Sequence, residues 1–321
     1  MRKSVLSCPS SRAIVCFFIA ALAVPAVRAD LVMYGSLGGH DNGDSRDDGS
    51  LALVNPVTAA VTVIGHPQNV AHLTGIAFES TGRLFASTLD FGLFPPPVLF
   101  PRTSELLLLD RNTGALITNI GRIKDTAGQQ MSTNRIAIQP GTDKLFAMRS
   151  PEDKTNGQSK LYTIDKTTGV ATLIGGPGTG ALLNFFGAIA FAPNGTLYMT
   201  TADLMPGVGA VHPRLLTLNP DTGQVLSTVN MKDYLPALGV RPEDGVLFGG
   251  IGDFSNQAGL ARLFTIDPAT GAETLIGNTG NRFVSSLAFG AAPVPEPSAV
   301  ALLTLGIIGL LSYGWRRQRV T

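Results

Sequence analysis

Cysteine is nearly absent from this chain of 321 residues, and its two cysteines, Cys8 and Cys16, lie close to the N-terminus. A disulfide-held fold, a thiolate metal site and a cysteine nucleophile are therefore excluded from the rest of the chain. Charged side chains make up only 15% of the residues, against about 25% in typical soluble domains. The formal net charge of +1 gives no sign of nucleic-acid binding.

Common enzyme motifs are also missing. The sequence contains no Gly-x-Ser-x-Gly, no His-Glu-x-x-His and no P-loop. A glycine-rich stretch at 175–180 follows an expected strand, but Pro177 interrupts it and no helical pattern comes after it. A phosphate cradle needs the N-terminus of a helix at this point. The sequence therefore predicts no catalytic residue.

The N-terminus has the three parts of an export signal. Arg2, Lys3 and Arg12 precede an apolar run from Ala13 to Val24, and a small-residue site ends at Ala29. This order is typical of a secretory signal peptide. We predict cleavage after Ala29, with an uncleaved anchor as the alternative.

The C-terminus carries a second candidate targeting signal. A Pro295-Glu296-Pro297 motif precedes an apolar stretch, 299–315, and Arg316 and Arg317 follow it. Seventeen residues at 1.5 Å rise span about 26 Å, just under a bilayer core of about 30 Å. The basic end predicts a cytoplasmic C-terminus.

This three-part tail resembles the PEP-CTERM sorting signal of Gram-negative bacteria. The resemblance implies recognition of Pro295, Glu296 and Pro297 by a membrane-embedded exosortase, commonly in bacteria that make extracellular polysaccharide. A plain C-terminal anchor is the alternative. The resulting division of the chain is a signal peptide (1–29), a domain outside the cytoplasm (30–292), a linker with the sorting motif (293–298), a transmembrane helix (299–315) and a basic tail (316–321).

One pattern repeats five times between these ends. An apolar strand leads into Asp or Asn, a turn that usually ends in Thr-Gly follows, and the next strand usually ends in Ile-Gly. The Asp or Asn positions are Asn55, Asp110, Asp165, Asn219 and Asp267. A period of about 50 residues is in the range of β-propeller blades.

Two further motifs interleave with the first. We name the four expected strands of each repeat A (Ile-Ala-Phe, as at 76–78), B (Leu-Phe, as at 84–85), C (into Asp or Asn) and D (into Ile-Gly). After residue 29 the chain begins with strand B, at Met33-Tyr34, and ends with strand A, at 287–289. The last strand would therefore complete the first blade and close a ring, which removes exposed sheet edges. We predict an all-β, five-bladed propeller with four-stranded blades.

The repeats resemble the YVTN, NHL and quinoprotein-like propeller repeats over nearly the whole of this domain. The resemblance implies the fold and no specific activity. The only tryptophan, Trp315, lies in the tail, so the tryptophan-docking motifs of quinoproteins are absent and a quinone cofactor is not expected.

Function is expected in the B–C and D–A links, because binding residues concentrate in variable loops on a rigid scaffold. The A–B and C–D links are short hairpins, whose aspartates we interpret as turn residues. All four histidines fall in the longer links, and three of them could form a zinc or copper site if they met. These three are His40, His66 and His72.

Acidic residues follow strand B at similar positions in the five repeats: Asp41, Asp90, Glu152, Asp203 and Asp253. A ring of carboxylates could bind Ca²⁺, which takes six to eight oxygen ligands. The alternative is that each acid caps its own loop as an Asx-turn. A separate candidate is the loop 41–49, in which Asp41 and Asp44 could ligate Ca²⁺ within a broken EF-hand-like pattern.

An apolar, proline-stiffened loop at 91–101 is a candidate partner-binding patch or a plug over the central channel. Its aromatic residues are Phe91, Phe94 and Phe100. From these features we predict an exported cell-envelope or extracellular-matrix protein that acts as a binding module for polysaccharide or envelope proteins, and not for nucleic acid. The alternatives are a divalent-metal-dependent hydrolase or lyase and a purely structural matrix protein.

Overall fold

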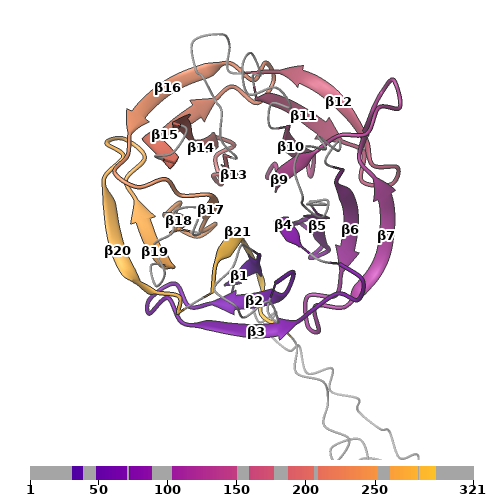
Figure 1. Ribbon diagram of the computed structural model, residues 1–321, viewed down its shortest axis with the longest axis horizontal. Coiled ribbons are helices and arrows are strands. Elements are labelled where there is room, and N and C mark those ends of the chain that lie inside the picture. Colours follow the sequence, from indigo (N-terminus) through magenta and orange to yellow (C-terminus); the bar gives the residue numbers. More distant parts are fainter. Residues whose placement is uncertain are drawn as a thin grey trace, which may run out of the picture.

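The chain folds into five β-sheets arranged as blades around a central axis (Figure 1). The computed structural model describes residues 31–38, 48–70, 72–88, 103–149, 159–176, 187–205, 209–251, 261–280 and 282–293. Across these ranges the secondary structure is entirely strand and turn, with no helix. The predicted five-bladed propeller is confirmed.

Each blade has four antiparallel strands in the order A-B-C-D from the axis outward. Blade one consists of β21 (Val284–Ala291), β1 (Leu31–Leu37), β2 (Leu51–Val54) and β3 (Val61–Gly65). Blade two consists of β4 (Leu73–Phe78), β5 (Leu84–Thr88), β6 (Glu105–Leu109) and β7 (Leu116–Arg122). Blade three consists of β9 (Thr133–Ile138), β10 (Leu145–Arg149), β11 (Lys160–Ile164) and β12 (Val170–Gly175), with the short β8 (Lys124–Asp125) added parallel to β12.

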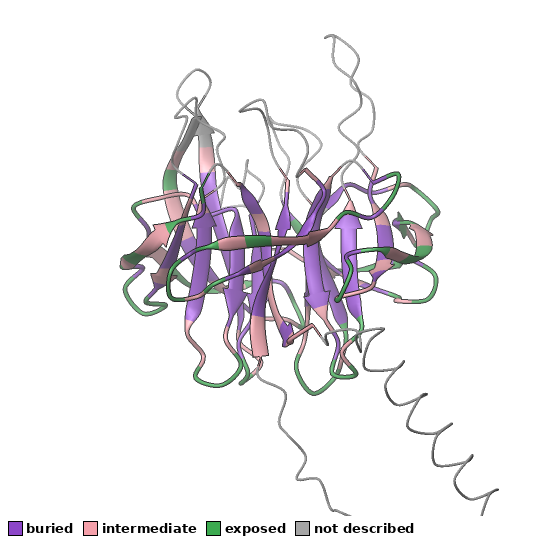
Figure 2. Ribbon diagram, turned by 90° about the horizontal axis from the view of Figure 1, so that it is seen from below, coloured by how far each residue is buried: buried purple, intermediate pink, exposed green. Residues whose placement is uncertain are grey.

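Blade four consists of β13 (Ile189–Phe191), β14 (Leu197–Met205), β15 (Gly209–Leu218) and β16 (Val225–Asn230). Blade five consists of β17 (Ala237–Val240), β18 (Leu247–Ile251), β19 (Arg262–Ile266) and β20 (Glu273–Asn278). Every predicted Ile-Ala-Phe-type segment lies in an innermost strand. The A–B turns lie together on one face of the disc, at the lower rim in Figure 2.

The hydrophobic core is divided among the five interfaces between neighbouring blades. In one cluster, Phe85 and Leu106 of blade two pack against Ile136 and Tyr162 of blade three. The other four clusters join the remaining pairs of neighbours in the same way. The alternation of side chains along a strand explains this arrangement, since each blade buries both of its faces.

The turns between strands C and D are held by the repeated Asp or Asn. Asp165 Oδ1 accepts hydrogen bonds from the backbone N–H groups of Thr167 (2.8 Å) and Thr168 (2.9 Å). Gly169 then adopts φ +71°, a left-handed conformation that favours glycine. Asn55, Asp110 and Asn219 accept bonds in the same pattern. The interpretation of these residues as turn-forming is confirmed.

The Ile-Gly ending of strand D has a separate role that depends on close contact between blades. A Cβ on Gly175 would lie 2.0 Å from the carbonyl oxygen of Thr222, in the C–D turn of the next blade. A Cβ on Gly65 would meet the carbonyl oxygen of Thr113 at the same distance. At these two positions the strand end and the C–D turn of the next blade therefore form one close junction, whereas Gly121 of blade two has no atom within 4 Å of an added Cβ.

The ring is closed by the two ends of the domain, as the phase of the repeats predicts. Strand β21 pairs antiparallel with β1, from Leu31 opposite Ala291 to Leu37 opposite Val284. The Tyr34 hydroxyl donates a 2.8 Å hydrogen bond to the carbonyl oxygen of Ala291, and burial raises the pKa of Tyr34 to about 12. Because Leu31 and Ala291 are paired where the other blades have their A–B turns, the propeller begins and ends on the A–B face.

Candidate functional site

Three of the predicted ligand-face residues lie in the described part of the chain. His66 is exposed, His72 is half-buried, and Asp203 is half-buried within β14. The other predicted residues lie outside the described residues. They are Asp41, Asp44, Asp90, Glu152, Asp253, His40, Phe91, Phe94 and Phe100, together with Pro295, Glu296, Pro297, Arg316 and Arg317 of the tail.

Asp203 contacts two side chains across the hairpin of blade four, and it forms an ion pair with Arg214. Its Oδ1 accepts a 2.5 Å hydrogen bond from Arg214, and its Oδ2 lies 3.2 Å from Nδ1 of His212. His212 is a non-glycine residue with φ +49°. Strands β14 and β15 extend through this region, with a register shift between Thr201 and Asp203. Asp203 thus contacts side chains of the paired strand β15.

No group of three or more His, Cys, Asp or Glu side chains that could hold a metal ion occurs among the described residues. His66, His72 and Asp203 therefore do not by themselves form the proposed metal centre. A Ca²⁺ site that uses the acidic residues of the B–C links stays a prediction.

A buried arginine lies near the axis, toward the B–C side of the channel. Arg135, in β9, is only 5% exposed. Its Nε donates to the carbonyl oxygen of Pro236 and its Nη1 to that of Thr74, both at 2.9 Å. The guanidinium group thus links blade three to blade two and to the segment that enters blade five. Burial lowers its pKa to about 10, so the group stays charged at neutral pH.

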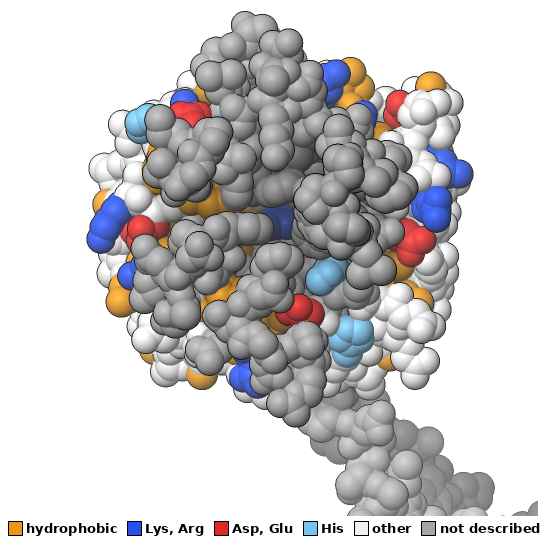
Figure 3. Space-filling model, in the orientation of Figure 1, with side chains coloured by type: hydrophobic (Ala, Val, Ile, Leu, Met, Phe, Trp, Pro, Cys, Tyr) orange, Lys and Arg blue, Asp and Glu red, His pale blue; other side chains and the backbone are white. Residues whose placement is uncertain are grey.

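Figure 3 views the molecule from the B–C side. It shows basic side-chain atoms close to the axis, with histidine side chains both near the middle and toward the upper left of this face. Buried hydroxyl-bearing residues lie near this end of the blades: Thr74, Thr133 and Ser286 on the innermost strands β4, β9 and β21, and Thr200 on β14. The B–C end of the described channel is therefore polar.

The opposite end of the axis contains a pocket of about 460 Å³, which we call the axial cup. It opens on the A–B face, because residues of all four A–B turns line it, together with the paired ends Leu31 and Ala291. Its walls are apolar, and each blade contributes one side chain from the end of its innermost strand: Phe78, Ile138, Phe191, Val240 and Phe289. A concave apolar site of 300–1,000 Å³ is typical of small-ligand binding.

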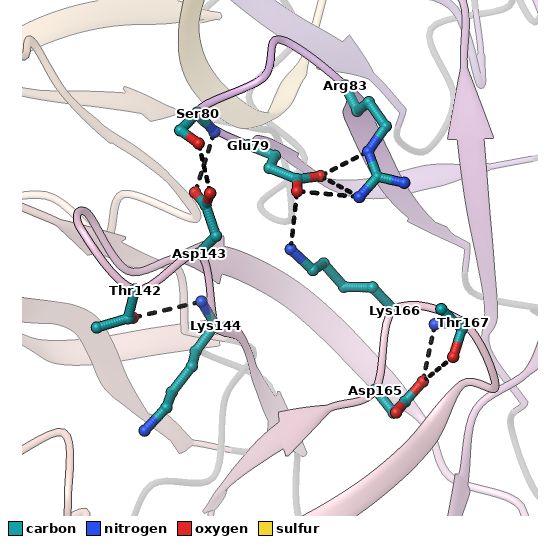
Figure 4. Close-up of polar contacts among 9 residues, drawn as sticks. All are labelled: Glu79, Ser80, Arg83, Thr142, Asp143, Lys144, Asp165, Lys166 and Thr167. Atoms are coloured by element: carbon teal, nitrogen blue, oxygen red, sulfur yellow. Dashed lines mark hydrogen bonds and ion pairs between the residues drawn. The ribbon is translucent and has the colours of Figure 1, made fainter.

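One side of the cup's rim carries a polar cluster that spans blades two and three (Figure 4). Glu79 forms hydrogen bonds with Arg83 at 2.7 and 2.9 Å and an ion pair with Lys166 at 3.2 Å. Asp143 accepts hydrogen bonds from the backbone N–H and the hydroxyl group of Ser80. These contacts join the two A–B turns to the C–D turn of blade three.

The electrostatics of this cluster favour ionised carboxylates. Hydrogen bonding to Arg83, with help from Lys166, lowers the pKa of Glu79. Hydrogen bonding to Ser80 lowers the pKa of Asp143. The Glu79 side chain is 8% exposed, so the charge of this carboxylate is compensated within the protein. The cluster is a fixed, internally paired element and not a free acid.

Sequence reasoning missed both Arg135 and the axial cup. The signal for Arg135 was present, since the equivalent position before the Ile-Ala-Phe motif is small in every other repeat: Gly75, Ala188, Ala237 and Ser286. The cup had no local signal, because its wall combines one side chain from each of five distant segments.

A comparison with protein-family models finds the PEP-CTERM protein-sorting motif at residues 293–318. The chain therefore carries a PEP-CTERM sorting signal. Such signals are recognised by exosortase and mark exported proteins that are anchored through the C-terminus. No helix within the described ranges is long and apolar enough to cross a membrane.

Solved structures with similar folds include a protein of unknown function from Bacteroides caccae, at 12% identity over 82% of this chain and 100% of that chain, with a TM-score of 0.45. Another is the PQQ-bound aldose sugar dehydrogenase from Streptomyces coelicolor, at 18% identity over 61% of this chain and 60% of that chain, with a TM-score of 0.39. A protein of unknown function from Dyadobacter fermentans has 10% identity over 74% of each chain and a TM-score of 0.49. A comparison with curated proteins gives no match. No activity is transferred from these structures.

Proposed function

We propose that this chain is a surface-tethered recognition module that binds extracellular polysaccharide or an envelope protein through the B–C side of the propeller. The observation that carries the proposal is the pairing of Leu31 with Ala291, by which the domain begins and ends on the A–B face. The sorting signal follows directly at residue 293. The tether therefore leaves from the face opposite the B–C links.

The length of the tether supports this orientation. Residues 292–298 separate the last strand from the predicted membrane helix 299–315. Seven extended residues reach at most about 25 Å. Before any cleavage of the tail, the A–B face would consequently stay within that distance of the bilayer, and the B–C side would point away from it.

The connections on the two faces differ in the way expected of a binding scaffold. A–B and C–D links are five or six residues long throughout, as at 79–83 and 110–115. The B–C links are mostly longer, for example 89–104 in blade two and 252–261 in blade five. Long variable links on a rigid scaffold are the usual location of binding residues. The loop 91–101 belongs to these links, and so do the predicted acids Asp41, Asp90, Glu152 and Asp253.

The proposal is tested by expressing the full chain in a host that has an exosortase and makes exopolysaccharide. The fraction of the chain that co-purifies with the polysaccharide is measured for the wild type and for a variant in which 91–100 is replaced by a Gly-Ser linker. A matched control carries a replacement of the A–B turn 192–196. We expect reduced retention only for the first variant.

Equal retention of both variants and the wild type would contradict this role of the B–C links. The same samples are assayed for new reducing ends with and without EDTA. Release of reducing ends that EDTA abolishes would favour the metal-dependent hydrolase instead.

A further inference from the structure

We infer that the axial cup is a second binding site, which takes a neutral hydrocarbon chain of a membrane lipid. The apolar ends of the five innermost strands form its wall, and Phe78, Ile138 and Phe289 in this wall are only half-buried. These side chains are therefore open to a ligand from the A–B face. Burial of a hydrocarbon chain against them is favourable, because each buried methylene group removes apolar surface from water.

A buried arginine lies between the cup and the B–C end of the channel. Arg135 lies next to the lining residue Ile136 in β9 and bonds to the carbonyl oxygens of Thr74 and Pro236. Thr74 lies near the start of β4 and Pro236 directly precedes β17, so both acceptors lie toward the B–C side. Because the cup opens on the A–B face and the guanidinium group lies behind it, we expect a ligand to enter from the A–B side.

The polar groups of the rim favour an uncharged ligand. Both carboxylates that line the cup are already engaged, Glu79 with Arg83 and Lys166, and Asp143 with Ser80. A carbohydrate would need several available polar partners, because its hydroxyl groups lose their hydrogen bonds to water on binding. The lining offers mainly aliphatic and aromatic carbon instead.

The charge of the whole face indicates which lipids it can approach. The A–B and C–D turns contain eight acidic and five basic side chains. Surfaces that bind anionic lipids are instead rich in Lys and Arg. This excess of acidic side chains therefore favours the hydrocarbon chains of zwitterionic or uncharged lipids. The inference that the ligand comes from a membrane rests on the proposed tether. The inference that the cup prefers hydrocarbon rests only on its apolar lining.

The inference is tested with the full chain in cells fed a diazirine-bearing fatty acid that is incorporated into membrane lipids. After irradiation, labelled peptides are identified by mass spectrometry. We expect label in the 299–315 segment and in peptides that contain Phe78, Ile138 or Phe289. Ile138→Glu should reduce labelling of the cup about tenfold, equivalent to about 1.4 kcal/mol. The matched control is Ile117→Glu on the outer strand β7, where the side chain is 58% exposed.

Label in 299–315 without label in the cup, or equal labelling of the cup in the Ile138→Glu variant, would overturn the inference. Absence of label from 299–315 would count against the tether instead. For that case the purified chain is irradiated with a neutral diazirine-bearing fatty alcohol in buffer. If the cup is not labelled in buffer, it is not a hydrocarbon-binding site. If the cup is labelled in buffer but never in cells, its ligand is not a membrane lipid. Thermal melts of both variants confirm that they are folded.

Discussion

The close contact between a D strand and the C–D turn of the next blade makes stability sensitive to the addition of a single methyl group. In Gly175→Ala, the new Cβ would lie 2.0 Å from the carbonyl oxygen of Thr222 and 3.0 Å from its carbonyl carbon. Ordinary C···O contacts are about 3.3–3.6 Å, so the turn must retreat by about 1.3 Å. Because the turn is backbone held by Asn219, a side-chain rotation cannot relieve the clash.

Overpacking of this kind costs about 1–3 kcal/mol. The substitution also restricts the unfolded chain, which offsets about 0.4–1 kcal/mol. We therefore expect Gly175→Ala to lower the free energy of unfolding by about 1–2 kcal/mol, measured by urea denaturation followed by circular dichroism. The midpoint of a thermal melt should fall by about 2–6 °C.

A substitution at Gly195 measures a different effect, the backbone strain that Gly175 does not have because its φ is not positive. Gly195 has φ +85° and no atom within 4 Å of an added Cβ, so Gly195→Ala reports only the cost of a left-handed alanine, about 1 kcal/mol. Gly65→Ala, with its own 2.0 Å approach to Thr113, should match Gly175→Ala. If Gly175→Ala were as stable as the wild type, the close junction between blades would be refuted.

Four further predictions concern stability. Tyr34→Phe removes the hydrogen bond to Ala291 and should cost about 1 kcal/mol in a denaturation curve. Arg135→Met leaves two buried carbonyl acceptors without their donor and should cost about 2 kcal/mol, with little recovery in Arg135→Lys. Because the pKa of Glu79 is lowered from 4.5, its contribution is present above pH 4.5 and is lost as pH falls through the folded-state pKa; melts should show a smaller acid-induced loss in Glu79→Gln than in the wild type. Since Asp203 is already paired with Arg214, Asp203→Asn should leave unchanged any difference in melting midpoint between Ca²⁺ and EDTA, whereas loss of a Ca²⁺ site at 100 times its Kd would remove about 2.7 kcal/mol.

The architecture could be predicted from sequence because its signals are local. The alternation of apolar residues, the Asp-to-Gly turns and the Leu-Phe strands each lie within a few residues, and their repetition gives the number of blades. The phase of the repeats, from Met33 in strand B to Phe289 in strand A, also predicts the ring closure. Local turn chemistry and the period of the pattern point to the same fold.

The candidate sites depend on contacts between distant segments, which one sequence does not reveal. Arg135 finds its acceptors 61 and 101 residues away, and both are backbone atoms with no sequence signature. Asp203 was expected after the end of strand B, but β14 continues to Met205 because the hairpin to β15 is closed by a short link. The Ile-Gly motif could be recognised as a repeat, but its contact with the Thr-Gly turn of the next blade required the structure.

The proposed orientation of the propeller, with its A–B face toward the membrane, can be measured by the accessibility of single cysteines. The only native cysteines lie within the predicted signal peptide, so single cysteines can be introduced at chosen positions of the propeller. One replaces His66, which is exposed in the D–A link that leads into blade two. The other replaces Thr81, which is exposed in an A–B turn. The full chain is produced in a host without exosortase, so that the tail stays attached, and intact cells are treated with a bulky PEG-maleimide. We expect faster modification of His66→Cys than of Thr81→Cys on cells, and equal rates after detergent solubilisation. Equal rates on cells, or faster modification of Thr81→Cys, would contradict this orientation.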